Sequence, residues 1–178
     1  QVFASIGSSF YAESGSIATF LGVAEYGLYR STNNGANWNR ITINNGAGRR
    51  EAPNDLEIGA DNRLWMSTTR NVFGDAGGSI WSSINGSTFT FVNQIPNADR
   101  TEIEPSSTDA TKFYALIDNS LNGQADIFIT TNTFTTITAL PEPDDADTGI
   151  SATDFTRGQA FYDLVVEADP TNDAIVYI

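Results

Sequence analysis

The sequence predicts an all-β fold made of β-propeller blades, each a four-stranded antiparallel meander. Apolar residues come in short alternating or β-branched runs, which Gly, Asn, Asp and Pro interrupt every 8 to 15 residues. Helical periodicity is nearly absent, so a helix of about three turns has no place in the chain. An internal repeat then selects a propeller over a sandwich or a barrel. The runs are Leu64–Met66, Ile80–Trp81, Phe89–Val92, Phe113–Ile117, Ile127–Ile129 and Leu164–Val166.

The repeat contains two kinds of two-strand segment. The first occurs at residues 27–41, 78–92 and 125–137, and reads as a strand, a polar turn and a second strand opened by an aromatic residue. The second has a strand, a turn rich in Asp, Asn or Pro, and a strand with a central aromatic residue. It occurs at residues 55–67, 101–115 and 163–178. One segment of each kind makes a four-stranded meander, the unit of a propeller blade.

Four strand aromatics mark equivalent points of the repeat: Phe3, Trp65, Tyr114 and Tyr177. Their spacing indicates about three repeats, at approximately residues 2–63, 64–112 and 113–175. Propellers typically close with about 4 to 8 blades, and an open arc exposes strand edges. We therefore expect the chain to be part of a larger propeller, with the remaining blades supplied by the same parent protein or by another chain.

Composition excludes several classes of function. The chain has 178 residues, with 9 Lys and Arg against 22 Asp and Glu, and a formal net charge of −13. Without a basic cluster it is not expected to bind nucleic acid. Without Cys or His it has no zinc finger, thiol nucleophile or Ser-His-Asp triad. No cofactor is required by this composition, and calcium remains an optional oxygen-ligated ion.

The same composition bears on localisation. No apolar run approaches the length of about 20 residues that a membrane-spanning helix needs, so membrane insertion is not expected. Lys112 is the only lysine, while Ser, Thr and Asn are abundant. Such a composition is typical of a secreted or cell-surface bacterial protein.

One turn carries a recognisable motif. Residues 31–38, Ser-Thr-Asn-Asn-Gly-Ala-Asn-Trp, match the Asp-box pattern Ser-x-Asp-x-Gly-x-x-Trp with Asn33 in place of Asp. The chain thus resembles the BNR/Asp-box propellers of sialidases, xyloglucanase-type glycoside hydrolases and sortilin-type receptors. Residues 161–178 are similar to blade-opening strands of large secreted surface proteins of Bacteroidota. The second copy has Ile84 at the acidic position, and the third has lost its glycine.

The Asp-box residues are expected to be structural. Asn33 is placed to accept backbone N–H groups of the turn, together with Ser31. Gly35 permits a positive φ, and Trp38 is expected to fold over the hairpin and to be buried. In the families that the motif resembles, the box lies at the propeller rim, away from the ligand face.

Candidate ligand-binding residues lie instead in the long loops. Arg49 and Arg50, followed by Glu51, form a pair that suits a bidentate clamp on a carboxylate or sugar acid; the alternative is a solvated loop. Phe161, Tyr162 and Asp163 combine two aromatic rings with a carboxylate, which suits sugar rings; the alternative is that the rings pack between blades.

An acidic loop at residues 141–149 is the candidate metal site. Its oxygen-bearing side chains suit calcium, although the EF-hand register is absent and acidic surface loops are common. The carboxylates in question are Asp144, Asp145 and Asp147.

Three functions remain open. The preferred one is an extracellular or cell-surface scaffold that binds a carbohydrate or a protein ligand within a larger secreted protein. The second is part of a glycoside hydrolase, for which Asp55, Asp75 and Asp163 are candidate carboxylates. The third is a structural module of an adhesin or a secretion-system cargo. The residue pattern of a sialidase site is not found, so enzymatic activity is left undecided.

Overall fold

The computed structural model describes residues 1–7, 24–143 and 154–178, and this part of the chain contains strands and no helix. The strands are β1 (Val2–Ile6), β2 (Gly27–Ser31), β3 (Asn39–Ile41), β4 (Ala52–Ile58), β5 (Leu64–Thr69), β6 (Ser79–Ser83), β7 (Thr90–Gln94), β8 (Ala98–Pro105), β9 (Phe113–Asn119), β10 (Ala125–Thr130), β11 (Thr138–Ala139), β12 (Glu167–Asp169) and β13 (Asn172–Tyr177).

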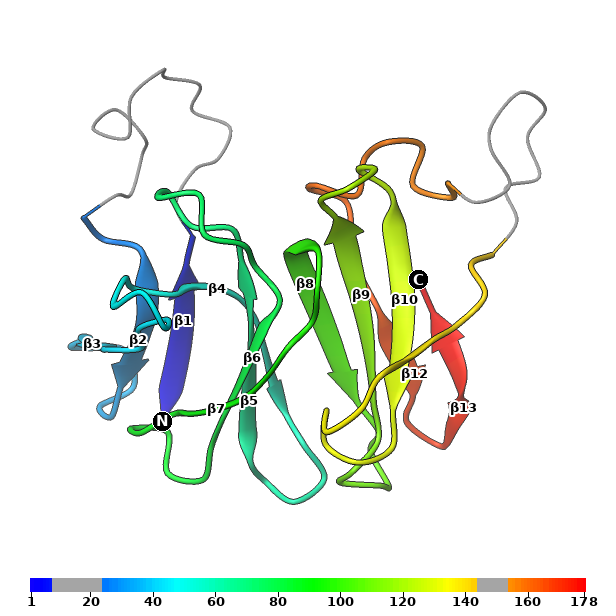
Figure 1. Cartoon of the computed structure of the whole chain (residues 1–178). Helices are drawn as coiled ribbons and strands as arrows, with labels where there is room; N and C mark the ends of the chain where they lie inside the picture. The colour runs from blue at the N-terminus through cyan, green and yellow to red at the C-terminus, as the bar shows by residue number, and fades with distance from the viewer. Residues whose placement is uncertain (8–23, 144–153) are drawn as a thin grey trace.

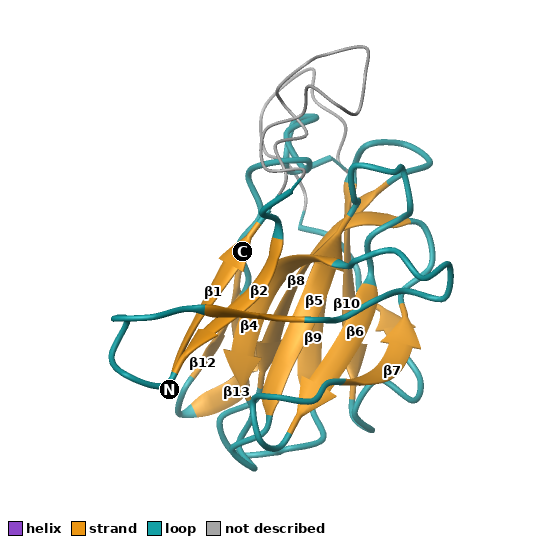
Figure 2. Cartoon of the chain, turned by 90° about the vertical axis from the view of Figure 1, so that its left-hand side faces the viewer, coloured by secondary structure: helices purple, strands orange, loops and turns teal. Residues whose placement is uncertain are grey.

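The strands form four antiparallel sheets that stand side by side (Figure 1). Two sheets are complete meanders, with orders β4-β5-β6-β7 and β8-β9-β10-β11. The other two are β1-β2-β3 and β12-β13. The all-β, propeller-like fold class predicted from the sequence is confirmed. The same sheets are seen from the side of β1 in Figure 2.

The register explains why the aromatic markers recur. Val2, Leu64 and Phe113 lie opposite the residue that opens the hairpin turn in each sheet, so Phe3, Trp65 and Tyr114 follow at equivalent positions. The sheets begin and end at other residues than the repeats expected from the sequence, at 64–112 and 113–175. Strands β4 to β7 span residues 52–94, and β8 to β11 span residues 98–139.

Apolar side chains fill the space between neighbouring sheets. Between the two complete sheets, Trp65 lies 4.6 Å from Phe113 and 5.9 Å from Phe134, measured between ring centroids. Tyr114 and Leu116 pack on the other face of their sheet, with Ala168 of the last sheet and with Val166 just before it. Burial of these large side chains supplies most of the favourable free energy of such a fold.

Hydrogen bonds between the inner strands of neighbouring sheets add to this packing. Ser5 Oγ donates to the Pro53 carbonyl at 2.9 Å, and Ser67 Oγ donates to the Thr101 carbonyl at 2.5 Å. The two serines are equivalent in register, and so are the two carbonyls. This repeated bond sets how the second strand of one sheet lies against the first strand of the next.

The hairpin turns bind their own backbone. Asn33 Oδ1 accepts the Asn37 N–H and Ser31 Oγ accepts the Gly35 N–H, both at 2.9 Å. In the second sheet Asn85, and not Ile84, takes the place of Asn33, because its Oδ1 accepts the Ser87 N–H at 2.8 Å. The third turn uses Asn132 in the same way.

The expected burial of Trp38 is wrong. Its side chain lies against the Gly35 turn but remains 42% exposed. The physical reason is its place beside β3, the outer strand of its sheet, where no further described strand packs over the indole.

Candidate functional site

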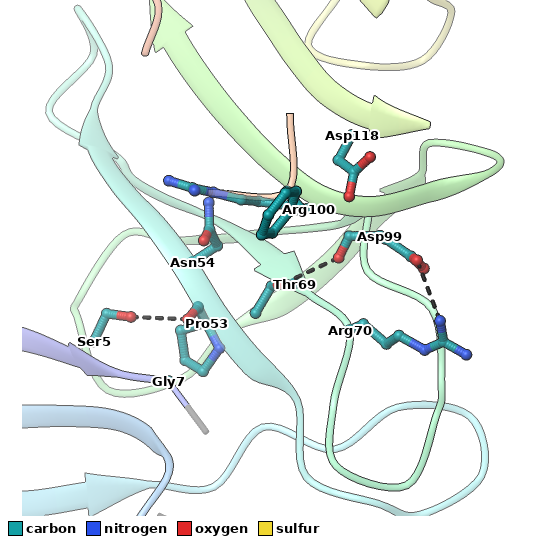
Figure 3. A pocket seen from close by; sticks show the side chains of 10 residues that line it. Ser5, Gly7, Pro53, Asn54, Thr69, Arg70, Asp99, Arg100 and Asp118 are labelled. Carbon is teal, nitrogen blue, oxygen red and sulfur yellow. Dashed lines mark hydrogen bonds and ion pairs between the residues drawn. The ribbon is translucent and has the colours of Figure 1, made fainter. Parts of the chain in front are cut away.

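A cavity of about 340 Å³ lies at the end of the inner strands where the β5–β6 and β9–β10 loops are found (Figures 1 and 3). We call it the axial pocket. Six segments of the chain line it, which come from three neighbouring sheets and from the loop before β12. The lining residues are Ser5, Gly7, Pro53, Asn54, Thr69, Arg70, Asp99, Arg100, Asp118 and Phe161.

Two irregularities of strand pairing place polar residues in this pocket. The register of β4 shifts between Pro53 and Leu56, and that of β8 shifts between Ala98 and Arg100. A β-bulge re-aims the side chains beside it, and bulges are common next to binding sites. Here the bulges lie at the same end of neighbouring strands and bring Asn54 and Asp99 to one cavity.

The wall at Asp99 is held by backbone contacts. Its carbonyl accepts the Arg70 N–H at 2.6 Å and the Thr69 hydroxyl at 3.1 Å. A Cβ atom at Gly77 would lie 2.4 Å from this carbonyl oxygen, so only glycine fits there. The approach fixes the β5–β6 loop against the start of β8.

Most charges of the pocket are paired within it. Arg70 Nη1 lies 3.2 Å from Asp99 Oδ2. Arg100 donates through Nε to Glu102 Oε1 at 3.0 Å, and Asn54 Nδ2 donates to the same oxygen at 3.0 Å. These contacts hold both guanidinium groups and the Asn54 amide in fixed directions.

Asp118 is the exception. Its side chain is only 8% exposed, and no described residue donates a hydrogen bond to its carboxylate. Arg100 lies opposite Asp118 in the strand register, but its guanidinium turns along β8 to Glu102. Burial raises the pKa of Asp118, the negative charge of Asp99 raises it further, and Arg100 opposes both.

Further carboxylates follow the inner strands away from the pocket. Glu57, Glu104 and Glu167 lie opposite Trp65, Tyr114 and Tyr177, so they are equivalent in register. Burial and neighbouring carboxylates raise the pKa of Glu57 to about 7, and burial above all raises that of Glu104 to about 7.

Asp55, a candidate carboxylate of the sequence, is held by backbone groups. Its Oδ1 accepts the Leu56 N–H at 2.8 Å and its Oδ2 accepts the Ile103 N–H at 2.9 Å. Burial raises its pKa in spite of these bonds. Asp55 and Asp75 do not line the axial pocket, and neither does Asp163.

The structure places Arg49, Arg50 and Glu51 outside the axial pocket. Arg49 pairs with Asp75 at 2.8 Å, and Arg50 lies over the Tyr26 ring at 4.4 Å and donates to the Tyr26 carbonyl at 2.9 Å. Glu51 is buried, and its carboxylate accepts from the Trp81 indole at 3.2 Å. These contacts tie the β3–β4 loop to its neighbours.

Phe161, Tyr162 and Asp163 lie close to the pocket. Phe161 lines it, and its ring packs edge-on against Tyr162 with centroids 4.3 Å apart. Both rings are more than two-fifths exposed, at 42% and 46%. Asp163 lines a second cavity, of about 390 Å³, on the other side of this segment.

The predicted calcium ligands Asp144, Asp145 and Asp147 lie outside the described residues. Within residues 1–7, 24–143 and 154–178, no three acidic side chains are grouped as a metal site would need. Calcium binding by the acidic loop stays a prediction.

Sequence reasoning missed Asn54, Arg70, Asp99, Arg100 and Asp118. Each lies at the start or end of an expected strand, and a predicted strand end carries no sign of which residues its neighbours bring close. The one available signal was that these polar residues border the inner strands of consecutive repeats.

Comparisons with known proteins support the fold and go no further. No family model matches the chain, and no curated protein matches it. Among solved structures, the chain is similar to the crystal structure of a GH74 enzyme from Niastella koreensis, with a TM-score of 0.53 and 19% sequence identity. The match covers 84% of this chain and 23% of that one, so the chain spans under a quarter of the enzyme's length.

That similarity, to a propeller enzyme, concerns the arrangement of strands only. In the part of the chain that the structure describes, no helix is both long and apolar enough to span a membrane.

Proposed function

We propose that this chain is a carbohydrate-binding segment of a larger secreted or cell-surface propeller of the BNR/Asp-box type, and that its ligand occupies the axial pocket. A protein ligand at the same loops is the other form of this binding role. The similar solved structure supports the carbohydrate form, because it belongs to a glycoside hydrolase.

The observation that carries the proposal is the make-up of the pocket wall. Asn54, Arg70 and Asp99 offer donors and acceptors held by internal contacts, while Phe161 offers an exposed aromatic face. A sugar ring has hydroxyl groups around its edge and apolar C–H groups on its faces. Ligand pockets of about 300 to 1,000 Å³ with few oriented polar groups are usual for small ligands, and this cavity falls within that range.

The test is binding of the full chain to a panel of soluble polysaccharides, measured by affinity electrophoresis and calorimetry. Phe161→Ala removes the aromatic face, and we expect it to weaken glycan binding by about tenfold, since stacking contributes about 1 to 2 kcal/mol. Phe91→Ala is the matched control, because Phe91 is similarly exposed at 49% but lies on the outer strand β7. Equal loss in both variants, or no binding to any glycan, would contradict the proposal.

Hydrolysis of a glycan is the second candidate, because Asp99 and Asp118 line the same pocket. Glycosidases use two carboxyl groups, one of them with a raised pKa as the general acid, and the pKa of Asp118 is raised. Release of reducing ends by the chain, lost in Asp118→Asn and kept in Phe91→Ala, would favour this candidate. Binding without release would leave the binding role alone.

A further inference from the structure

We propose that the axial pocket selects a glycan that carries a free ammonium group, that is, an amino sugar that is not N-acylated, and that Asp118 is the residue that binds this group. This inference rests on the proposed carbohydrate-binding function and adds the chemical class of the sugar.

The first argument is the state of Asp118 itself. Its side chain is more than nine-tenths buried, it lines the pocket, and no described residue donates to its carboxylate. Figure 3 shows this carboxylate above Asp99, apart from the Arg70 guanidinium that pairs with Asp99. A carboxylate with so little exposed surface and no protein donor is stabilised by a partner that supplies hydrogen bonds and positive charge.

The second argument is the charge balance of the wall. Arg70 is paired with Asp99, and Arg100 is paired with Glu102, so the two cations of the pocket are already neutralised. Asp118 is then the one charged lining residue that has no ion pair or hydrogen bond with a described residue, although the Arg100 charge still acts on it. A cationic ligand would pair with this carboxylate, and an ammonium offers three N–H donors besides its charge.

The third argument is the field around the pocket. The inner strands β4, β8 and β12 carry Asp55, Glu57, Glu104 and Glu167, with Arg100 as their only cation. The whole chain has a formal net charge of −13. An excess of one sign of charge around a pocket attracts counter-ions of the other sign, and this effect weakens with salt.

Other sugar classes fit this wall less well. A sugar acid would bring its carboxylate to Asp118 and Asp99, where like charges repel, unless it displaced Asp99 from Arg70. A neutral sugar would donate a hydroxyl to Asp118 but would bring no positive charge to it. The burial of Asp118 and the pairing of the neighbouring charges therefore favour the amino sugar.

The experiment compares three tetrasaccharides of one linkage and length, built of glucosamine, N-acetylglucosamine and glucose. Each is titrated calorimetrically into the full chain at low salt, at a pH where the free amine is charged. We expect the glucosamine tetramer to bind at least about tenfold more tightly than the other two, the effect of one charge-assisted hydrogen bond. Calcium chloride alone serves as a further probe, and competition by it at low concentration would overturn the proposal.

Two variants assign the preference to Asp118. Asp118→Asn keeps the shape and removes the charge, so we expect the three affinities to become equal within about twofold, with the neutral tetramer little affected. Asp61→Asn removes a charge at the β4–β5 turn, outside the pocket, and is expected to keep the tenfold preference. Thermal melting checks that both variants fold.

The outcomes separate this inference from the function beneath it. If the three tetramers bind wild-type chain equally, the amino-sugar inference is wrong and the carbohydrate-binding function stands. If none of the three binds, the amino-sugar inference is wrong, and the polysaccharide panel then decides whether the carbohydrate-binding function fails as well. A preference that survives in Asp118→Asn, or that disappears equally in Asp61→Asn, would show that general electrostatic attraction and not Asp118 selects the ligand. The wild-type comparison decides the sugar class even if Asp118→Asn does not fold.

Discussion

The turns and the inner strands of this protein use carboxylates in opposite ways. In the turns after β8 and before β13, Asp109 and Asp169 accept backbone N–H groups of the residue two positions on, at 2.8 Å in both cases. The hydroxyls of these two residues, both threonines, also donate to the carboxylates, and the hydroxyl bonds, followed by the backbone bonds, lower the pKa of both groups. On the strands that lead into these turns, burial raises the pKa of Glu104, and the same holds for Glu57 in the preceding sheet.

The difference distinguishes carboxylates that stabilise the fold from carboxylates whose burial costs stability. A turn carboxylate is ionised in the folded chain and satisfies backbone donors. An inner-strand carboxylate loses solvent and gains few donors, so its charged form costs stability. Groups of the second kind are the ones to examine for function, because strained or poorly satisfied groups cluster at functional sites.

The largest expected effect comes from Gly77→Ala. The added Cβ would lie 2.4 Å from the Asp99 carbonyl oxygen and 2.8 Å from that of Thr68. Because both obstacles are backbone, the β5–β6 loop must move, and we expect a loss of about 3 kcal/mol in the free energy of unfolding. Urea denaturation measures it. Gly46→Ala is the control, since nothing lies within 4 Å of a Cβ there and its φ is ordinary; equal effects in both variants would contradict the assignment of a rigid wall.

A smaller loss is expected when a turn loses its hydroxyl acceptor. Ser83 is buried at 3% exposure, and its Oγ accepts the Gly86 N–H at 2.9 Å. Ser83→Ala leaves this buried N–H without its partner, which costs about 1 to 2 kcal/mol. Ser120→Ala, at an exposed position in the β9–β10 loop, should change stability by less than about 0.5 kcal/mol. Thermal melts of both variants measure the two changes in stability. A fall in glycan binding in Ser83→Ala would show that this turn does more than stabilise the fold.

The sequence predicted the strands and their equivalence well, because both follow from periodic patterns. Phe3, Trp65 and Tyr114 recur since the same register places each beside the start of a hairpin. The second turn was misaligned at Ile84. Its serine and glycine are three residues apart, whereas Ser31 and Gly35 are four apart, so aligning the glycines shifted the polar residue by one.

The site was harder to predict because it depends on contacts between repeats. The pocket exists because β4 and β8 both have a β-bulge at the same end. The residue types around Pro53 and Ala98 do not predict where the strand register shifts. Asp118 has no ion pair because Arg100 donates to Glu102 and not to Asp118. The strand register alone does not predict which of these two carboxylates Arg100 binds. Arg49 and Arg50 were singled out by their charge, yet Asp75 and the Tyr26 ring engage them.

The two kinds of carboxylate should give opposite dependences of stability on pH. The pKa of Glu57 and of Glu104 is raised from 4.5 to about 7 in the folded chain, so between these values the folded state holds more protons than the unfolded state. Their contribution to stability is therefore full below about pH 4.5 and is lost as the pH rises through about 7. Glu57→Gln and Glu104→Gln should each raise the free energy of unfolding by about 1 kcal/mol above pH 7, after discounting for partial exposure, with little change near pH 4.

Asp109→Asn is the matched test of the opposite sign. Because the pKa of Asp109 is lowered, its contribution is present above the ordinary pKa of an aspartate and is lost as the pH falls through the lowered value. The variant should thus be less stable than wild type at neutral pH and equal to it in strong acid. Denaturation across the pH range measures the free energy of unfolding of Glu57→Gln, Glu104→Gln and Asp109→Asn. A shift in the same direction in all three variants would contradict the contrast.

The smallest expected effect tests whether the first hairpin turn works as an Asp-box. Asn33 Oδ1 accepts the Asn37 N–H and the Ser31 hydroxyl, both at 2.9 Å, so each bond needs only an oxygen acceptor at that position. Asn33→Asp keeps both acceptor contacts and makes them charge-assisted, while it adds one negative charge to a chain that already carries −13. Since Asn33 is exposed, both terms are small, and we expect a gain of about 0.5 kcal/mol that shrinks in acid. Asn34→Asp adds the same charge at the next residue and should be neutral or slightly destabilising in the same thermal melts. A gain in Asn34→Asp, or a loss in Asn33→Asp, would show that net charge and not the turn geometry decides the result.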